Sequence, residues 1–187
     1  LQGTAFISEM AGNYHRSIII THTTLFIAMT TVFSWISIPF IPVPITLQTM
    51  AVLLTGTIMK RYAGIPMALY LLLGAIGLPV FHNGTAGLGV LLGPTGGYLV
   101  GFIPAAILVG LCYEQVSEKI QIAGLALGTF IIYLCGLSWL VISVPMNLTA
   151  AITAGMLPFL PGDIIKAAAA FLITRRILPY TTRLSDP

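Results

Sequence analysis

The chain has 187 residues, of which 57% are hydrophobic and only 7% charged, and its mean hydropathy is +1.00. Soluble domains carry about 25% charged residues, so this composition argues against a water-soluble globular domain and indicates a chain that lies mainly in lipid. The net charge of +3 does not indicate nucleic-acid binding, because the basic residues flank apolar runs and form no interleaved patch.

The first apolar segment, 17–36, is long enough to cross a bilayer. The polar stretch before it, 1–16, is treated as an N-terminal tail, part of which we interpret as an expression scar. After the segment comes "SIPFIPVPIT", which we expect to be an extended loop because proline disfavours helix at the preceding residue. Two short spans are predicted next, at 46–59 and 65–78, with "KRYAG" turning the chain between them.

Residues 79–96 are rich in Gly and Pro yet carry no charge. Irregular backbone at membrane depth is tolerated only against protein or a cavity, so we expect this loop to fold back over the helices. Three more spans are predicted at 97–113, 120–144 and 163–178. A second uncharged, weakly helical connection, 145–162, precedes the last of them. One membrane domain, 17–180, then ends in a short tail, 181–187.

Positive charge sets the expected topology. Apart from Lys166, the basic residues lie before the first span, in alternate connections, and at or after the end of the last span: Arg16, Lys60, Arg61, Lys119, Arg175, Arg176 and Arg183. The three connections on the other face contain no Lys or Arg. By the positive-inside rule both termini are cytoplasmic. The prediction is an all-α integral membrane protein with six transmembrane helices in one bundle.

Asp163 and Lys166 are the acid and the base that this topology places on the outer side. Three residues apart, they share one face of a helix. Asp163 could simply cap the helix start after "PG", with Lys166 neutralising it. A charge inside a span is expensive, however, and by default marks a functional interior. We therefore predict a binding site here for a small, strongly hydrogen-bonding or zwitterionic solute.

Other candidates lie in the outer loops. Asn83, in "VFHNGTAG", offers both a donor and an acceptor, as recognition of a cyclic amide or urea requires, although "NG" is also a common turn. Gln48 follows the proline-rich loop and faces either a ligand or a backbone group. "LLGPTGGYLVG" lacks the Lys-Ser/Thr ending of a phosphate-binding loop; its glycines instead allow Thr95 and Tyr98 to approach a pocket.

The sequence predicts no enzyme. It contains no GxSxG, no HExxH and no paired intramembrane carboxylates, so we expect neither catalytic residues nor a metal site. Cys112 and Cys135 lie in apolar segments and are interpreted as packing residues. The sequence contains no Walker motif, so any active transport must be energised by something other than this chain, and we expect the chain to need no cofactor.

Four motifs in order, "PVPITLQT", "GLPVF", "AGLGVLLGPTGGYLVGF" and "FLPGDIIKA", resemble the BioY family, the biotin-binding S components of energy-coupling factor (ECF) transporters. The resemblance covers roughly residues 20–180. It implies a multi-pass prokaryotic plasma-membrane protein that captures biotin at the outer face. It also implies a transmembrane coupling protein and two cytoplasmic ATPases as partners.

The resemblance further implies that Asp163 and Lys166 are polar contacts to biotin, with Asn83, Gln48 and the "GPTGGY" loop completing the pocket. We expect Asp163 to accept from the N–H groups, Asn83 to bind the carbonyl and Lys166 to bind the carboxylate. The alternatives are a stand-alone secondary transporter or channel for a small polar solute, in which Asp163 takes part in proton coupling, and an intramembrane enzyme.

Overall fold

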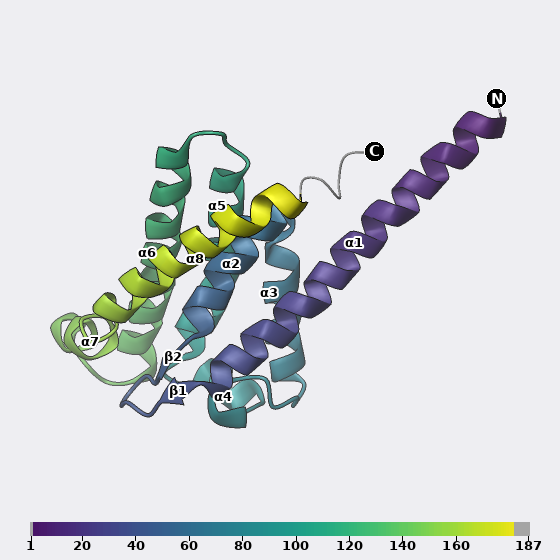
Figure 1. The fold of residues 1–187 in the computed structure, drawn as a ribbon. Coiled ribbons are helices and arrows are strands. Elements are labelled where there is room, and N and C mark those ends of the chain that lie inside the picture. The colour runs from purple at the N-terminus through teal and green to yellow at the C-terminus, as the bar shows by residue number, and fades with distance from the viewer. Residues whose placement is uncertain (1, 182–187) are drawn as a thin grey trace.

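The computed structural model describes the backbone of residues 2–181 and the side chains of residues 16–177. Within that part of the chain, six helices of twelve residues or more form the body of the molecule (Figure 1): α1 (Gln2–Trp35), α2 (Gln48–Met59), α3 (Gly64–Ala75), α5 (Gly96–Tyr113), α6 (Glu118–Ser143) and α8 (Leu160–Thr181). Every predicted span corresponds to one of them.

Helix α5 lies at the centre of the bundle and packs most extensively on α6, because small residues on both helices let the backbones approach. A Cβ added to Gly97 would lie 2.2 Å from the Cβ of Trp139, and one added to Gly128 would lie 2.5 Å from Cγ2 of Val109. Gly97 and Gly128 therefore lie where the backbones of α5 and α6 come close together.

One end of the bundle carries the irregular segments. Strands β1 (Ser37–Ile38) and β2 (Ile45–Thr46) form an antiparallel hairpin, and the 3-10 helix η2 (His82–Gly84), α4 (Leu88–Leu92) and α7 (Leu148–Gly155) lie at the same end (Figure 1). The hairpin and the helical turns were not predicted from the sequence. In these uncharged segments, the hairpin and the helical turns provide hydrogen-bond partners for backbone amides that water does not reach.

Hydrogen bonds tie the end of α1 to the loop before η2. The hydroxyl of Ser34 donates to the carbonyl of Val80 at 2.8 Å, and Nε1 of Trp35 donates to the carbonyl of Pro79 at 3.1 Å. Tyr70, buried in α3, also donates to the Val80 carbonyl, at 2.8 Å. This loop is therefore fixed to two helices, as expected for irregular backbone folded over a membrane bundle.

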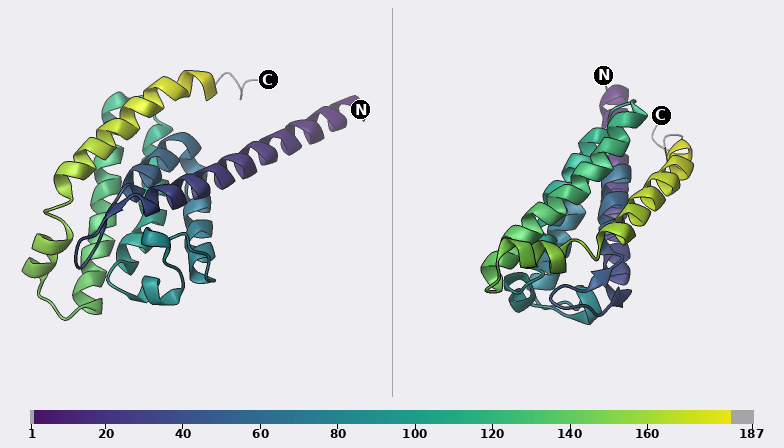
Figure 2. Two further views of the ribbon diagram at one scale, coloured as in Figure 1. Left: turned by 60° about the horizontal axis from the view of Figure 1, so that its bottom comes forward. Right: turned by 90° about the vertical axis from the view of Figure 1, so that its left-hand side faces the viewer.

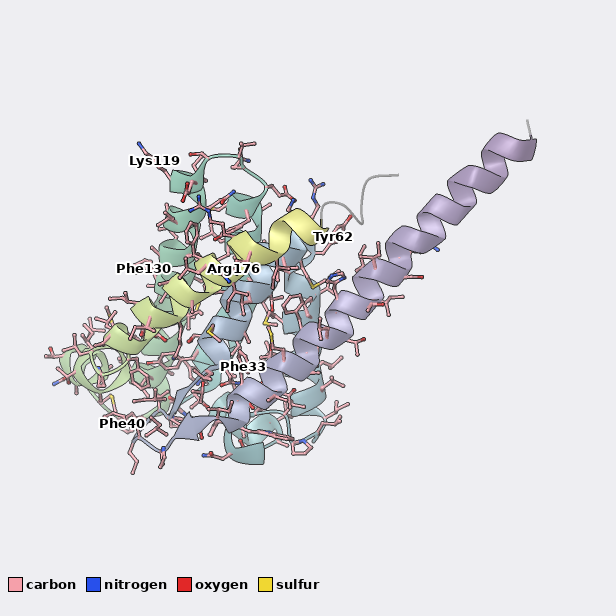
Figure 3. The ribbon with its side chains drawn as sticks, in the orientation of Figure 1. Phe33, Phe40, Tyr62, Lys119, Phe130 and Arg176 are labelled. Carbon is pink, nitrogen blue, oxygen red and sulfur yellow. The ribbon has the colours of Figure 1, made fainter. Side chains whose placement is uncertain are left out.

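The opposite end carries the charged residues. Lys119 lies there, far from Phe40 beside the hairpin (Figure 3). Arg61, in the 3-10 turn η1 (Lys60–Tyr62), pairs with Glu114 at 2.7 Å, and a second ion pair joins Arg175 to Glu118 at 3.1 Å. The hydrogen bond and charge of Glu114 raise the pKa of Arg61, and those of Arg61 lower the pKa of Glu114. Helix α1 starts and α8 ends at this end (Figures 1 and 2).

By length and hydropathy, three helices of the described chain could each cross a membrane, at Arg16–Trp35, Gly96–Tyr113 and Glu118–Ser143. A fourth span results if α7 and α8, bent by 53° at a short break, count as one. Helices α2 and α3, with twelve residues each, are shorter than the roughly 20 residues of an upright span. The chain is thus a helical membrane protein.

Two predicted boundaries differ in the structure. Residues expected to form a separate N-terminal tail continue α1, which begins at Gln2 and projects beyond the other helices (Figure 2). The third helix ends at Ala75, before the predicted end of the span at 78, because Gly77 adopts a φ of 107° that helices do not contain. Apart from Thr181, the predicted C-terminal tail lies outside the described residues.

Candidate binding site

A cavity of about 50 Å³ lies at the end of the bundle that carries the hairpin. Its wall comes from the hairpin, α2, the η2 turn, α5, α6 and α8, and consists of Val43, Pro44, Thr46, Gln48, Thr49, His82, Thr95, Tyr98, Leu99, Phe102, Ile132, Tyr133, Phe159, Asp163 and Lys166. A few polar groups in a largely apolar wall are typical of small-molecule sites. Five of the six residues predicted for the site line it.

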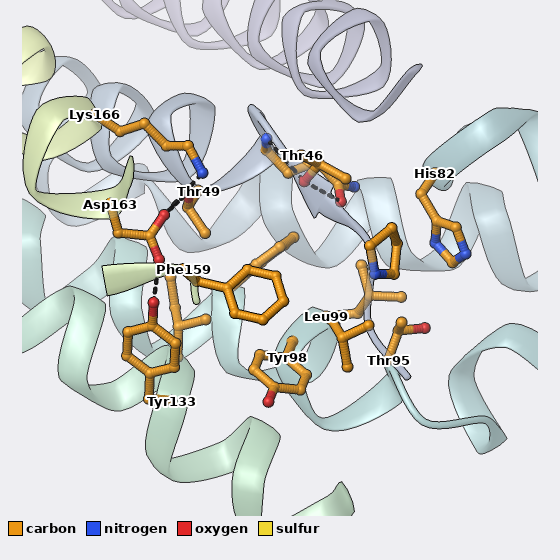
Figure 4. Close-up of a pocket in the computed structure, with 15 residues that line it drawn as sticks. Thr46, Thr49, His82, Thr95, Tyr98, Leu99, Tyr133, Phe159, Asp163 and Lys166 are labelled. Atoms are coloured by element: carbon orange, nitrogen blue, oxygen red, sulfur yellow. Dashed lines mark hydrogen bonds and ion pairs between the residues drawn. The ribbon is translucent and has the colours of Figure 1, made fainter. Parts of the chain in front are cut away.

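Asp163 lies at the centre of a charged cluster at one end of the cavity (Figure 4). Its Oδ1 accepts hydrogen bonds from Lys166 Nζ at 2.8 Å and Thr49 Oγ1 at 3.0 Å, and its Oδ2 accepts one from the hydroxyl of Tyr133. Asp163 and Lys166 are 5% and 8% exposed. These bonds come from side chains on three helices, whereas a capping role would direct the carboxylate to backbone amides. The cluster fits a binding site better than a cap.

Gln48 lines the cavity with both ends of its amide engaged. Its Nε2 donates to the hydroxyl of Tyr70 at 2.6 Å, and its Oε1 accepts from Thr46 Oγ1 at 3.2 Å. Tyr70 in turn donates to the Val80 carbonyl. Gln48 therefore connects the cavity wall to the loop that precedes η2, in addition to facing the cavity itself.

Tyr98 and Thr95 flank the start of α5. The ring of Tyr98 faces the cavity while its hydroxyl donates to the carbonyl of Gly155 in α7 at 2.9 Å. The hydroxyl of Thr95 makes a long hydrogen bond of 3.5 Å to the carbonyl of Val90 and is free to turn to a ligand. The "GPTGGY" loop thus reaches the cavity as the sequence suggests.

Asn83 is the predicted residue that the structure does not bring into the cavity wall. It is exposed, adopts a φ of 54°, and accepts a hydrogen bond from the hydroxyl of Ser37 in the hairpin. Its neighbour His82 lines the cavity instead. Burial lowers the pKa of His82 below its ordinary value, so the imidazole is neutral at pH 7. In this structure Asn83 joins the η2 turn to the β1–β2 hairpin.

The sequence reasoning missed Tyr133, Thr49 and Phe159. Tyr133 is a single tyrosine in the apolar run "FIIYLCG", and a hydroxyl in such a run needs a partner. That signal could have marked it as an interior residue. Which partner it meets depends on how α6 and α8 pack, and the sequence does not show this.

The cavity has two different ends. Asp163, Lys166 and Tyr133 gather at one, His82 and Thr95 lie at the other, and Phe159, Tyr98 and Leu99 stand between them (Figure 4). Such a site fits an elongated ligand with a strongly hydrogen-bonding head, an apolar middle and a polar tail. Within residues 16–177 no cluster of three or more His, Cys, Asp or Glu side chains could hold a metal ion.

Comparison with known proteins points to transport. The chain is 44% identical over 155 residues to the biotin transporter BioY of Thermotoga maritima, a match that covers 82% of this chain and 91% of that protein. It is 40% identical over 154 residues to a probable biotin transporter BioY of Pyrococcus horikoshii, again covering 82% and 91%.

A solved structure matches as well. The crystal structure of the S-component for biotin from an ECF-type ABC transporter aligns with a TM-score of 0.80 and 30% identity, covering 89% of this chain and 94% of that one. The model of the BioY family matches residues 9–183. The chain therefore belongs to the BioY family.

Proposed function

We infer that the chain is the biotin-binding membrane subunit of an ECF-type importer, a transport protein and not an enzyme. The observation that carries this inference is the cluster around Asp163, which supplies a carboxylate acceptor and an ammonium donor inside a mostly apolar cavity. Biotin combines a polar cyclic urea with an apolar thiophane ring and a valerate chain. The names of the relatives and the structural neighbour support the same ligand.

We propose that biotin lies along the cavity with its ureido ring at Asp163. Lys166 Nζ lies 2.8 Å from Asp163 Oδ1, and the valerate chain that separates biotin's ureido ring from its carboxylate is far longer. One end of the ligand therefore meets both residues. Asp163 accepts an N–H, Lys166 donates to the carbonyl, and the carboxylate points toward His82 and Thr95. This arrangement replaces our sequence-based assignment of the carboxylate to Lys166.

The orientation in the membrane is also a proposal. The six longer helices cross the bilayer, with α2 and α3 continued by adjoining turns, and the cavity opens outward. The basic residues at the opposite end support cytoplasmic termini in a prokaryotic plasma membrane. ATP hydrolysis and the coupling step belong to partner subunits, a transmembrane coupling protein and two ATPases. The chain itself carries no cofactor.

Equilibrium binding of biotin to the purified protein, measured by calorimetry, tests this function. We expect tight binding by the wild type, and losses of at least tenfold for Asp163→Asn and Lys166→Ala, since hydrogen bonds to charged groups contribute about 1.5–3 kcal/mol each. Lys119→Ala, at an exposed position on the charged end, is the matched control. Absence of biotin binding by the wild type would overturn the proposal.

Uptake into liposomes separates an ECF subunit from a stand-alone transporter. Vesicles that hold this chain alone should bind biotin without concentrating it. Vesicles that also hold the coupling protein and ATPases should accumulate it when ATP is supplied. Accumulation by the chain alone, driven by a proton gradient, would favour the stand-alone transporter.

A further inference from the structure

Asp163 has few hydrogen-bonding sites left for a ligand. A carboxylate offers about four lone-pair positions, two on each oxygen. Oδ1 already accepts from Thr49 and Lys166, and Oδ2 accepts from Tyr133. One position therefore remains, on Oδ2. Lys166 has three N–H donors and uses one of them on Oδ1 of Asp163, which leaves two N–H donors for a ligand at the same carboxylate.

The donors that occupy Asp163 are held by the fold. Tyr133 is 5% exposed and comes from α6, while Thr49 comes from the first turn of α2. Both side chains line the cavity without being charged. Their hydroxyls fix the carboxylate from two sides, so Asp163 cannot turn to meet a ligand that presents donors in a different pattern.

We propose that Tyr133 and Thr49 are positioning residues that restrict the Asp163–Lys166 pair to reading a single amide edge, one N–H donor beside one carbonyl acceptor. This inference rests on the proposed function and specifies how that site selects its ligand. The two N–H groups of a cyclic urea point away from each other, so the one open acceptor position on the carboxylate can accept a hydrogen bond from only one of them. The ligand class is therefore cyclic ureas and lactams, and the second ureido N–H contributes nothing at this pair.

Two biotin derivatives test the proposal, one methylated at each ureido nitrogen in turn. The isomer that keeps the N–H facing Asp163 should bind the wild type within about threefold of biotin, because it keeps the hydrogen bond to the charged group. The other isomer should bind about tenfold to a hundredfold more weakly, the range for a lost hydrogen bond to a charged group. Equal binding of the two isomers would overturn the proposal, because the site would then read both N–H groups or neither.

The role of Tyr133 is tested by the ratio of the two isomer affinities. Tyr133→Phe keeps the ring and releases Oδ2, so Asp163 loses its fixed direction. Discrimination between the isomers should fall to less than about threefold, with most of the loss in the isomer that donates to Asp163. If Tyr133 only packs, both isomers weaken equally and the ratio is unchanged, which would refute its positioning role.

Two further variants complete the experiment. Tyr113→Phe is the matched control, since the buried Tyr113 hydroxyl lies in α5 outside the cavity wall and has no hydrogen-bond partner among the described residues. It should leave both isomer affinities unchanged. Thr49→Val removes the other hydroxyl while keeping the side-chain shape, and answers the same question should Tyr133→Phe fail to fold. Failure of wild-type protein to bind biotin itself would instead overturn the proposed function.

Discussion

Removing the charge of Lys166 should lower the stability of the protein. Removing the charge of Asp163 as well should restore the stability without restoring biotin binding. The side chains of Lys166 and Asp163 are only 10% and 6% exposed, so Lys166→Met leaves a carboxylate buried without its counter-charge. Breaking a buried pair in this way costs about 3–5 kcal/mol. Hydrogen bonds from Thr49 and Tyr133 remain and offset part of it, so we expect a loss of about 2–4 kcal/mol in the free energy of unfolding.

The assay is thermal unfolding in detergent, followed by intrinsic fluorescence or by the soluble fraction after heating. A loss of that size lowers the melting temperature by about 5–15 °C for a chain of this length. Lys119→Met, at an exposed position, should melt as the wild type does. The double variant Asp163→Leu/Lys166→Met should recover most of the stability, because an apolar pair replaces a buried ion pair at little cost. It should not bind biotin.

Two results would refute this reasoning. If Lys166→Met melted with the wild type, the ion pair would not contribute to the stability of the fold. If the double variant were less stable than Lys166→Met, the cluster would stabilise the fold beyond its charge balance, and its main role would be structural.

Three other changes have defined outcomes. Gly74→Ala would place a Cβ 2.0 Å from the buried ring of Phe81, so it should lower both the melting temperature and biotin affinity, whereas Gly89→Ala, with nothing within 4 Å, should do neither. Burial keeps the pKa of His82 low in the empty site; a nearby carboxylate raises it, so biotin should bind with proton uptake and more tightly as pH falls from 7 toward 5. Calorimetry in buffers of different ionisation enthalpy measures this uptake, and His82→Gln should abolish it. Glu114→Gln breaks an exposed ion pair and should leave melting unchanged within error, since such pairs contribute little; a marked drop would contradict this.

The parts of the fold that depend on composition could be predicted from the sequence. Long apolar runs indicated the positions of the six longer helices. Asp163 and Lys166 were conspicuous because charge is rare in this chain.

The parts of the fold that depend on packing between helices could not be predicted from the sequence. The β1–β2 hairpin has two residues per strand, too few for an alternating pattern to appear. Tyr133 and Asp163 are 30 positions apart, and their contact depends on the rotation of α6 against α8. Asn83 has the right chemistry for a ligand, but the turn at η2 directs it to Ser37. The local sequence identifies the side chain, but the direction in which it points depends on the tertiary structure.

The hydrogen bonds from the end of α1 also have a mechanical consequence. Ser34 and Trp35 donate hydrogen bonds to the carbonyls of Val80 and Pro79, and Ser37 in β1 donates one to Asn83, so the end of α1 is connected to the loop that bears His82. With 34 residues α1 is about 50 Å long, and much of that length projects beyond the bundle (Figure 2). We expect a force applied to the projecting part of α1 to reach the rim of the cavity through these hydrogen bonds.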